Sequence, residues 1–184
     1  MKIKNLELGV TIPEKVTVTV EGKTVKVKGP NGELSRSFND FPTLGMKIEN
    51  NEVLLSIKDA NKKEKTHIGT AEAHIANMMI GAVSNHVYKL KICASHFPMT
   101  ATVSGDTFTV KNFLGEKIPR VTKIEHGVSV KVEGQEITVQ GADIEKTGIV
   151  AARIEQLTRI VKRDIRIFQD GIYMTKKPKK EISA

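Results

Sequence analysis

Hydrophobic and polar residues alternate along the first part of the chain, and this period of two predicts β-strands. Residues 16–20 and 24–28 alternate on either side of a Glu-Gly-Lys turn, so we expect a hairpin there. A Gly-Pro-Asn-Gly turn then leads into a third expected strand at 33–38. Residues 46–49 and 53–57 predict a second hairpin, joined by two asparagines that tolerate the left-handed backbone of such turns.

The period changes near Thr66, where apolar positions begin to recur every three or four residues and predict a helix with one buried face. The residues of that face are Ile68, Ala71, Ile75, Met79, Ala82 and His86. Residues 58–65, which precede the helix, are polar and predict a charged loop. Residues 87–94 predict a strand that leaves the first folding unit, and the chain is expected to enter a second unit near residues 96–98.

The second half of the chain repeats the first. Segment 20–33 aligns without gaps on segment 103–116, and half of the aligned positions are identical. Two shorter matches occur further along in the same order: Lys47, Glu49 and Glu52 with Lys131, Glu133 and Glu136, and residues 65–71 with 146–152. Tandem duplication explains this order better than chance does. We therefore predict an α+β fold with two copies of a small domain, each of antiparallel strands and one packed helix, covering residues 1–93 and 94–184.

A helix is also expected in the second copy, with Thr147 as its N-cap. Arg159, Lys162 and Arg163 fall outside its apolar stripe, so they are expected to point outward from the helix. The stripe itself consists of Val150, Ile154, Leu157 and Val161.

The residues after this helix predict a strand and then a turn. Residues 164–168 alternate, which would place Arg166 on the side opposite its two isoleucine neighbours. Asp170-Gly171 predicts a turn, and the residues after Tyr173 have too little apolar content to fold alone.

Positive charge is concentrated in residues 153–180. This stretch holds nine Lys or Arg against three carboxylates, which leaves about +6 of the net +8 of the whole chain. A polyanionic partner suits such a distribution, because each cation that meets a phosphate releases condensed counterions. The nine cations are Arg153, Arg159, Lys162, Arg163, Arg166, Lys176, Lys177, Lys179 and Lys180.

Each part of this stretch also has a simpler interpretation. Charged residues on a helix face are usually just solvated, but Arg outnumbers Lys before residue 170, and the guanidinium fork fits phosphate. On composition alone, residues 176–180 are as consistent with a frayed terminus as with a binding tail. Tyr173 is expected to pack over the domain beside a turn held by Gly171.

The same stretch resembles a known family. Gln156, Ile160, Arg163, Arg166, Phe168 and the run 170–174, ending at Lys177, stand at the spacings of the large-subunit ribosomal protein L-six family. The spacings are those of its archaeal and eukaryotic branch, in which the eukaryotic name is L-nine. The resemblance extends along nearly the whole chain, and the small size of the chain suggests the archaeal side.

The resemblance implies a structural constituent of the large ribosomal subunit that binds rRNA mainly through its C-terminal repeat. It implies a position beside the sarcin-ricin loop, with large-subunit rRNA, neighbouring ribosomal proteins and nearby translation factors as partners. The nine cations would then clamp rRNA helices by their phosphates, and Tyr173 would both pack and contact rRNA. Recognition of double-helical RNA would depend mostly on backbone shape.

Other classes of protein find less support in the sequence. It shows no nucleophile elbow, paired carboxylates or dinucleotide fingerprint, so we predict no enzyme and no cofactor. Five scattered histidines predict no metal site, and a single Cys93 excludes internal disulfides and fits a reducing compartment. No signal peptide or membrane span is recognisable, so we expect a cytoplasmic location and no membrane partner. The resemblance implies that this location is the ribosome.

Two alternatives stay open, namely an RNA-binding module that acts outside the ribosome and an enzyme with a site assembled from distant residues.

In the first repeat, basic and acidic residues are interleaved. We expect that repeat to face a protein neighbour or solvent, with a lesser RNA contact. Its only local basic cluster is Lys58, Lys62, Lys63 and Lys65.

Overall fold

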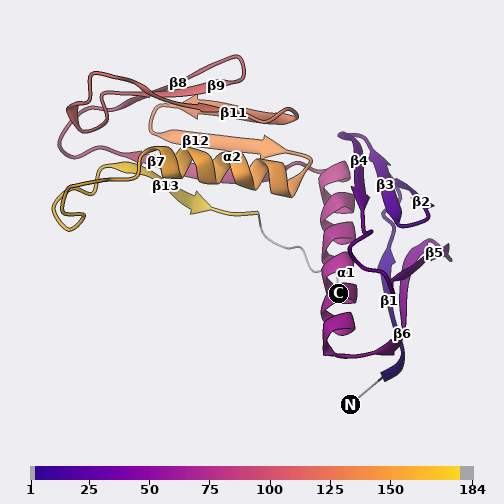
Figure 1. The fold of residues 1–184 in the computed structure, drawn as a ribbon. Helices are drawn as coiled ribbons and strands as arrows, with labels where there is room; N and C mark the ends of the chain where they lie inside the picture. The colour runs from indigo at the N-terminus through magenta and orange to yellow at the C-terminus, as the bar shows by residue number, and fades with distance from the viewer. Residues whose placement is uncertain (1–2, 179–184) are drawn as a thin grey trace. The chain divides into compact units, whose positions relative to one another are not determined.

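The structure is a computed structural model that describes residues 3–178. The chain forms two compact units, the first ending at Asn85 and the second beginning at His86. Each unit combines antiparallel sheets with one long helix, which confirms the predicted α+β class (Figure 1). Within the described residues, no helix is long and apolar enough to cross a membrane.

Unit 1 contains two three-stranded sheets and one helix. The sheets have the strand orders β1-β6-β5 and β2-β3-β4, and all their pairings are antiparallel. The helix, α1, packs against β1, β3 and β6 and so contacts both sheets. The bounds are β1 Ile3–Thr11, β2 Thr17–Glu21, β3 Thr24–Gly29, β4 Gly32–Ser37, β5 Gly45–Glu49, β6 Glu52–Ala60 and α1 Lys62–Val83.

Both predicted hairpins of unit 1 are confirmed. In the first, β2 pairs with β3, and β4 is the third strand of that sheet. In the second, β5 pairs with β6 through Asn50 and Asn51, whose φ angles of 49° and 64° are the left-handed values expected of them. Local turn chemistry therefore sets the register of both hairpins.

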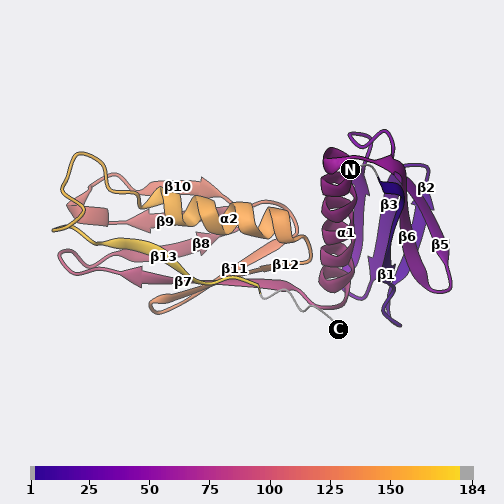
Figure 2. The same cartoon turned by 90° about the horizontal axis from the view of Figure 1, so that it is seen from below.

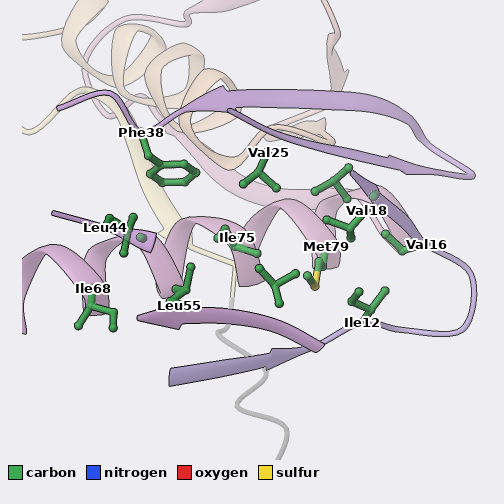
Figure 3. Packing of buried hydrophobic residues seen from close by; sticks show 14 of the residues in the cluster. Ile12, Val16, Val18, Val25, Phe38, Leu44, Leu55, Ile68, Ile75 and Met79 are labelled. Atoms are coloured by element: carbon green, nitrogen blue, oxygen red, sulfur yellow. The ribbon is translucent and has the colours of Figure 1, made fainter. Parts of the chain in front are cut away.

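The core of unit 1 lies between the two sheets and α1. Figure 3 shows Val25 reaching in from one sheet, Phe38 from the chain just after β4, Leu55 from the other sheet, and Ile75 from the helix. Val25, Leu55 and Ile75 are completely buried. Burial of these apolar side chains is the main term that stabilises the unit, at roughly 1.5–3 kcal/mol for each large side chain removed from water.

Two predictions for unit 1 are wrong. Residues 58–65 are not a loop, because β6 continues to Ala60 and α1 begins at Lys62, with the Glu64 carboxylate accepting a hydrogen bond from the Asn61 N–H at 2.9 Å. His86 is not on the helix, which ends at Val83. The strand β1 was also missed, although its alternating Leu and Val residues pack on the core.

Unit 2 has a four-stranded sheet of order β11-β12-β7-β13 and a three-stranded sheet of order β10-β9-β8. The helix α2 lies along the larger sheet and contacts β7, β12 and β13 (Figures 1 and 2). The bounds are β7 His86–Cys93, β8 Thr100–Ser104, β9 Thr107–Lys111, a 3₁₀ turn at Phe113–Gly115, β10 Arg120–Lys123, β11 Val128–Glu133, β12 Glu136–Gly141, α2 Ile144–Leu157 and β13 Gly171–Lys176.

The strand β7 belongs to unit 2, since it pairs with β12 on one edge and with β13 on the other. The structure therefore divides the chain between Asn85 and His86 and not between residues 93 and 94. The topology explains why: β7 pairs with the strand before α2 just as β1 pairs with the strand before α1. Each copy thus begins with a strand that pairs with the last strand before its helix; the sequence pattern missed β1, and it predicted β7 as a strand but not as the start of unit 2.

The internal repeat is visible in the topology. The β2–β3 hairpin corresponds to β8–β9, and the pairing of Glu49 with Glu52 corresponds to that of Glu133 with Glu136. The match at the helix start fails in burial, because Ile68 is fully buried whereas Ile149 is 46% exposed. Positions that match in the sequence alignment of the two helices therefore do not face their cores in the same way.

Candidate nucleic-acid interface

The helix α2 ends at Leu157, so Arg159, Lys162 and Arg163 are not on it. The side chain that terminates it comes from β10: Arg120 Nη1 donates to the carbonyl oxygens of Leu157 at 2.7 Å and Arg159 at 3.2 Å. The Leu157 carbonyl is one of the groups that a helix end leaves without partners, and a cation suits the negative end of the helix dipole. Arg120 therefore fixes the direction in which the chain leaves the helix.

The start of α2 also differs from the prediction. Asp143 is the N-cap, because its carboxylate accepts hydrogen bonds from the N–H groups of Glu145 at 2.9 Å and Lys146 at 3.3 Å. Thr147 lies inside the helix, is fully buried, and donates its hydroxyl to the Asp143 carbonyl at 2.6 Å. The stripe from Val150 to Ile154 is buried as predicted.

Residues 159–169, which we call the basic loop, connect α2 to β13. The predicted strand at 164–168 is wrong, since this segment is a turn in which the N–H groups of Ile167 and Phe168 donate to the Asp164 carbonyl at 3.2 and 2.9 Å. Three apolar residues of the loop do not reach the core, since Val161, Ile165 and Ile167 are each about two-thirds exposed, whereas Ile160 is partly buried against it. The loop therefore presents cations and aliphatic side chains together.

The far end of the loop is tied down by a buried carboxylate. Asp170 accepts hydrogen bonds from the Ser95 N–H, from the His96 N–H at 3.3 Å, and from His96 Nδ1 at 2.9 Å. Burial alone would raise the pKa of Asp170, but these donors outweigh it and hold the pKa below its usual value. Asp170 thus stays ionised and joins the basic loop to the segment after β7.

Further contacts hold the first residues of β13 against α2. The Ile172 N–H donates to Thr158 Oγ1 at 2.8 Å, and the Met174 N–H donates to Glu155 Oε1 at 2.9 Å. Tyr173, which is 44% exposed, donates its hydroxyl to the Gln169 carbonyl at 3.0 Å. Because of burial, the pKa of Tyr173 is raised. Beyond Tyr173 the chain continues as β13 to Lys176 by pairing with β7, so these residues are ordered against a neighbouring strand and not alone.

The cations of the loop differ in their partners. Arg166 pairs with Asp164 in its own turn at 2.7 Å, which lowers the pKa of Asp164. The Arg163 guanidinium lies 4.9 Å from the centre of the Phe168 ring, whose centre is in turn 4.9 Å from that of the His96 ring. Among residues 3–178, the structure shows no carboxylate partner for Arg159, Lys162 or Arg163.

The other predicted cations are spread more widely. Arg153 is on α2 and pairs with Glu125 at 2.6 Å. Lys176 ends β13, and Lys177 comes after it in exposed, irregular chain. Lys179 and Lys180 lie outside the described residues. The structure thus brings Arg159, Lys162, Arg163 and Arg166 together in one loop and leaves Arg153 and Lys176 on flanking elements.

Sequence reasoning missed three residues that build this interface. Arg120 holds the loop base, Glu116 receives a two-point contact from the Arg120 guanidinium at 2.6 and 2.8 Å, and His96 completes the Asp170 anchor. Arg120, and more weakly Arg163, keep the pKa of Glu116 below its usual value. No local signal marks the roles of Arg120 and His96, because Leu157, Arg159 and Asp170 lie far away from them in the chain. In residues 3–178, the structure contains no cluster of three His, Cys, Asp or Glu side chains that could hold a metal ion.

Comparison with known proteins gives one consistent family. The family model described as ribosomal protein L6 matches residues 12–82 and 97–171, which are the two repeats. The large ribosomal subunit protein uL6 of Ignicoccus hospitalis is 46% identical over 169 residues, covering 90% of this chain and 91% of its own length. The proteins of the same name from Natronomonas pharaonis and Methanobrevibacter smithii are 41% and 44% identical, each covering more than nine-tenths of both chains. Matches of this extent, over both repeats and the basic loop, show that the chain belongs to the ribosomal protein L6 family.

Proposed function

We propose that this chain is a structural protein of the large ribosomal subunit and that it binds rRNA mainly through unit 2. Family membership supports the first part, because the three relatives are named large ribosomal subunit protein uL6. On this proposal the protein works in the cytoplasm as a part of the ribosome, and its role is structural and not enzymatic. The basic loop supports the second part.

The observation that carries the proposal is a set of exposed cations on a loop whose two ends are fixed. Arg120 holds the loop where α2 ends, and Asp170 holds it where β13 begins. Between these anchors, Arg159, Lys162 and Arg163 are exposed and lack carboxylate partners within the described residues. Cations that are already ordered lose less conformational entropy when they meet phosphates, which favours binding.

The mechanism depends on the chemistry of these side chains. Arg159 and Arg163 present planar guanidinium groups that donate two parallel hydrogen bonds to one phosphate, while Lys162 acts as a point charge. The pair of Arg166 with Asp164 lies on an exposed surface, where such pairs contribute little, so phosphate can compete for that guanidinium. Lys176 and Lys177 would extend the contact along β13, and Lys179 and Lys180 beyond the described residues.

The position of the contact is part of the proposal. We place the basic loop, Arg153 and Tyr173 against rRNA in the sarcin-ricin region, near the site where translation factors dock. Unit 1 would face neighbouring ribosomal proteins or solvent, with a lesser RNA contact through Lys58, Lys62, Lys63 and Lys65. All four of these lysines are exposed, and three of them are in the first turns of α1.

The test is binding of the full chain to a large-subunit rRNA fragment that contains the sarcin-ricin region, across a salt series. One variant changes Arg159, Lys162, Arg163 and Arg166 to Ala. The matched control changes Lys58, Lys62, Lys63 and Lys65 to Ala, which removes the same charge from unit 1. Each phosphate contact contributes about 0.7–0.9 to the slope of log K against log salt, so we expect the loop variant to lose about three units of slope.

The control variant should retain most of the wild-type slope. Equal losses in the two variants would show that only net charge matters and would overturn the assignment to the basic loop. Ribosome membership has its own test: the wild-type protein should co-sediment with large subunits through washes in high salt. Release in the wash, with RNA binding intact, would instead favour an RNA-binding module that acts outside the ribosome.

A further inference from the structure

Three loops meet at one end of unit 2, where β7, β9 and α2 all finish (Figures 1 and 2). They are residues 94–99, residues 112–119 and the basic loop, and we call them together the loop end. Asn112 Nδ2 donates to the Pro98 carbonyl at 2.8 Å, and the Phe97 ring packs on Gly115. The neighbouring rings of His96 and Phe168 connect the first of these loops to the basic loop. The loop end is therefore one continuous surface.

This surface exposes large apolar side chains. Ile118 is 81% exposed, and each of the other four exposes between 41% and 67% of its area. Scattered exposed hydrophobic residues need no explanation, but a cluster of them marks an interaction site. The five residues are Phe97, Ile118, Val161, Ile165 and Ile167.

The charges that remain unpaired among these apolar residues are positive. The loop end and its border with β13 contain three carboxylates, and each is already engaged: Glu116 by Arg120, Asp164 by Arg166, and Asp170 by His96. Lys117 adds a cation to those of the basic loop, and it is exposed. A partner of this surface must therefore offer negative groups and apolar area close to each other.

We propose, on the basis of the rRNA-binding function proposed for unit 2, that these apolar side chains form a second part of the same RNA-binding surface. Cations of the loop end hold phosphates, while Ile118, Ile165 and Ile167 pack on ribose and base faces between them. RNA offers this combination, because the minor groove of an A-form helix is wide and shallow and exposes its sugars. Phe97 adds an aromatic face on which an unpaired base can stack.

The two parts of the surface predict different dependence on salt. Contacts between cations and phosphates release counterions and set the slope of log K against log salt. Apolar contacts release no counterions, so they strengthen binding equally at every salt concentration. Removal of apolar side chains should therefore shift the whole binding curve and leave its slope unchanged.

The test uses the full chain, the same rRNA fragment and a triple variant in which Ile118, Ile165 and Ile167 are each changed to Ser. These side chains are largely exposed, so the fold should tolerate the changes, and hydrogen exchange of unit 2 will confirm this. We expect binding to weaken about 10- to 100-fold at every salt concentration, which corresponds to partial burial of three aliphatic side chains. The matched control changes three exposed aliphatics outside the loop end, Ile48, Val103 and Ile149, to Ser and should bind as wild type does.

Three outcomes would overturn the proposal. Wild-type affinity in the Ile118, Ile165 and Ile167 variant would show that RNA does not cover these side chains. If the slope of log K against log salt fell together with the affinity, the changes would have displaced the cations as well. Equal weakening in the control variant would show a general effect of surface polarity. Failure of the proposed function looks different, because the wild-type protein would then bind the fragment without a steep salt slope.

Discussion

The two units share a topology but differ in the segment after the helix. In unit 1, α1 has 22 residues and continues to Val83, and β7 begins three positions later at His86. In unit 2, α2 has only 14 residues, and the chain then forms the basic loop and β13 before the described part ends. The sheets that precede the helices correspond strand by strand, although residues 112–119 of unit 2 replace the tight turn between β3 and β4.

The shorter helix of unit 2 is the feature that creates the interface. Met79 and Ala82 extend the buried face of α1, so the late turns of that helix have a core to cover. Beyond Leu157, Arg120 binds the chain of unit 2 as it turns away from the helix, and Val161, Ile165 and Ile167 stay exposed to solvent. Duplication thus supplied two equivalent scaffolds, and a change after the helix converted one of them into a candidate binding surface.

A cavity in either helix–sheet core should have the largest effect on stability. Because each cavity lies in one unit, the two variants should also show which unit binds RNA. Ile75 and Ile154 are fully buried on α1 and α2, and replacing either by Ala should destabilise its own unit by about 2–5 kcal/mol. Hydrogen exchange should accelerate in unit 1 for Ile75→Ala and in unit 2 for Ile154→Ala. We expect only Ile154→Ala to weaken RNA binding. Equal weakening by both variants would contradict the assignment of RNA binding mainly to unit 2.

Loss of the Asp170 anchor should have the next largest effect. Asp170→Ala leaves the N–H groups of Ser95 and His96 without their acceptor in a partly buried site, which should cost about 2 kcal/mol. Urea unfolding measures this loss, and the salt series measures the accompanying loss of RNA affinity. Asp170→Asn should lose less stability, because its amide oxygen still accepts hydrogen bonds. An Asp170→Ala protein with wild-type stability and affinity would show that the anchor has no role.

Acid should reveal the same anchor without mutation. The pKa of Asp170 is lower in the folded protein than its ordinary value of 3.8, so its stabilising contribution is fully present above that pH. The contribution is lost as the pH falls through the lowered pKa. The difference in free energy of unfolding between wild type and Asp170→Asn should therefore be constant near neutral pH and shrink in strong acid. A difference that grew with acidity would have the wrong sign and would exclude this explanation.

The Arg120 contact tests how α2 is brought to an end. Arg120→Ala removes two hydrogen bonds to the helix end and a cation held 4.4 Å from the centre of the Phe113 ring, which should cost about 1.5–2 kcal/mol. We expect faster hydrogen exchange in the basic loop and weaker RNA binding. Lys26→Ala, which removes an exposed cation paired with Glu21 in unit 1, is the control and should change neither. If hydrogen exchange in the basic loop of Arg120→Ala were unchanged, a contact other than that of Arg120 would have to end the helix.

The N-cap of α2 should give the smallest effect. Asp143→Ala removes the carboxylate that accepts from Glu145 and Lys146, and such caps contribute about 1 kcal/mol. The far end of α2 carries the interface, so RNA affinity should hardly change at a temperature where the variant is folded. Thermal unfolding and the salt series measure the two quantities. A large loss of affinity would show that the whole helix, and not its end, positions the loop.

Local patterns predicted strands β2 to β6 of unit 1, but not β1, because the alternation and turn signals of those strands are local. Alternation places side chains on two faces of a strand, and the asparagines between β5 and β6 adopt the left-handed backbone expected of them. The repeat could also be read directly, since matching residues lie in matching hairpins. The cations of the basic loop were predicted as RNA-binding residues from charge and family resemblance, and that role stays a prediction.

The two errors after α2 share one physical cause. Val161 continues the helical spacing of Ile154 and Leu157, yet it lies 66% exposed after the helix has ended. A periodic pattern shows which positions would share a face, but the packed structure decides whether there is a core to cover. The alternation at 164–168 misled in the same way, because these residues have no neighbouring strand to pair with among the described residues.

The sequence by itself determined the α+β class, the duplication, the hairpins of unit 1 and the concentration of positive charge near the C-terminus. Those features depend on residues that are close together in the chain or on its composition. Only the tertiary structure decided where α2 stops, that β7 starts the second unit, and that three loops form one surface. Each of these depends on a contact between residues that are distant in the chain, such as Arg120 with Leu157 or Ser95 with Asp170. Such contacts can stabilise the protein only once the chain has folded.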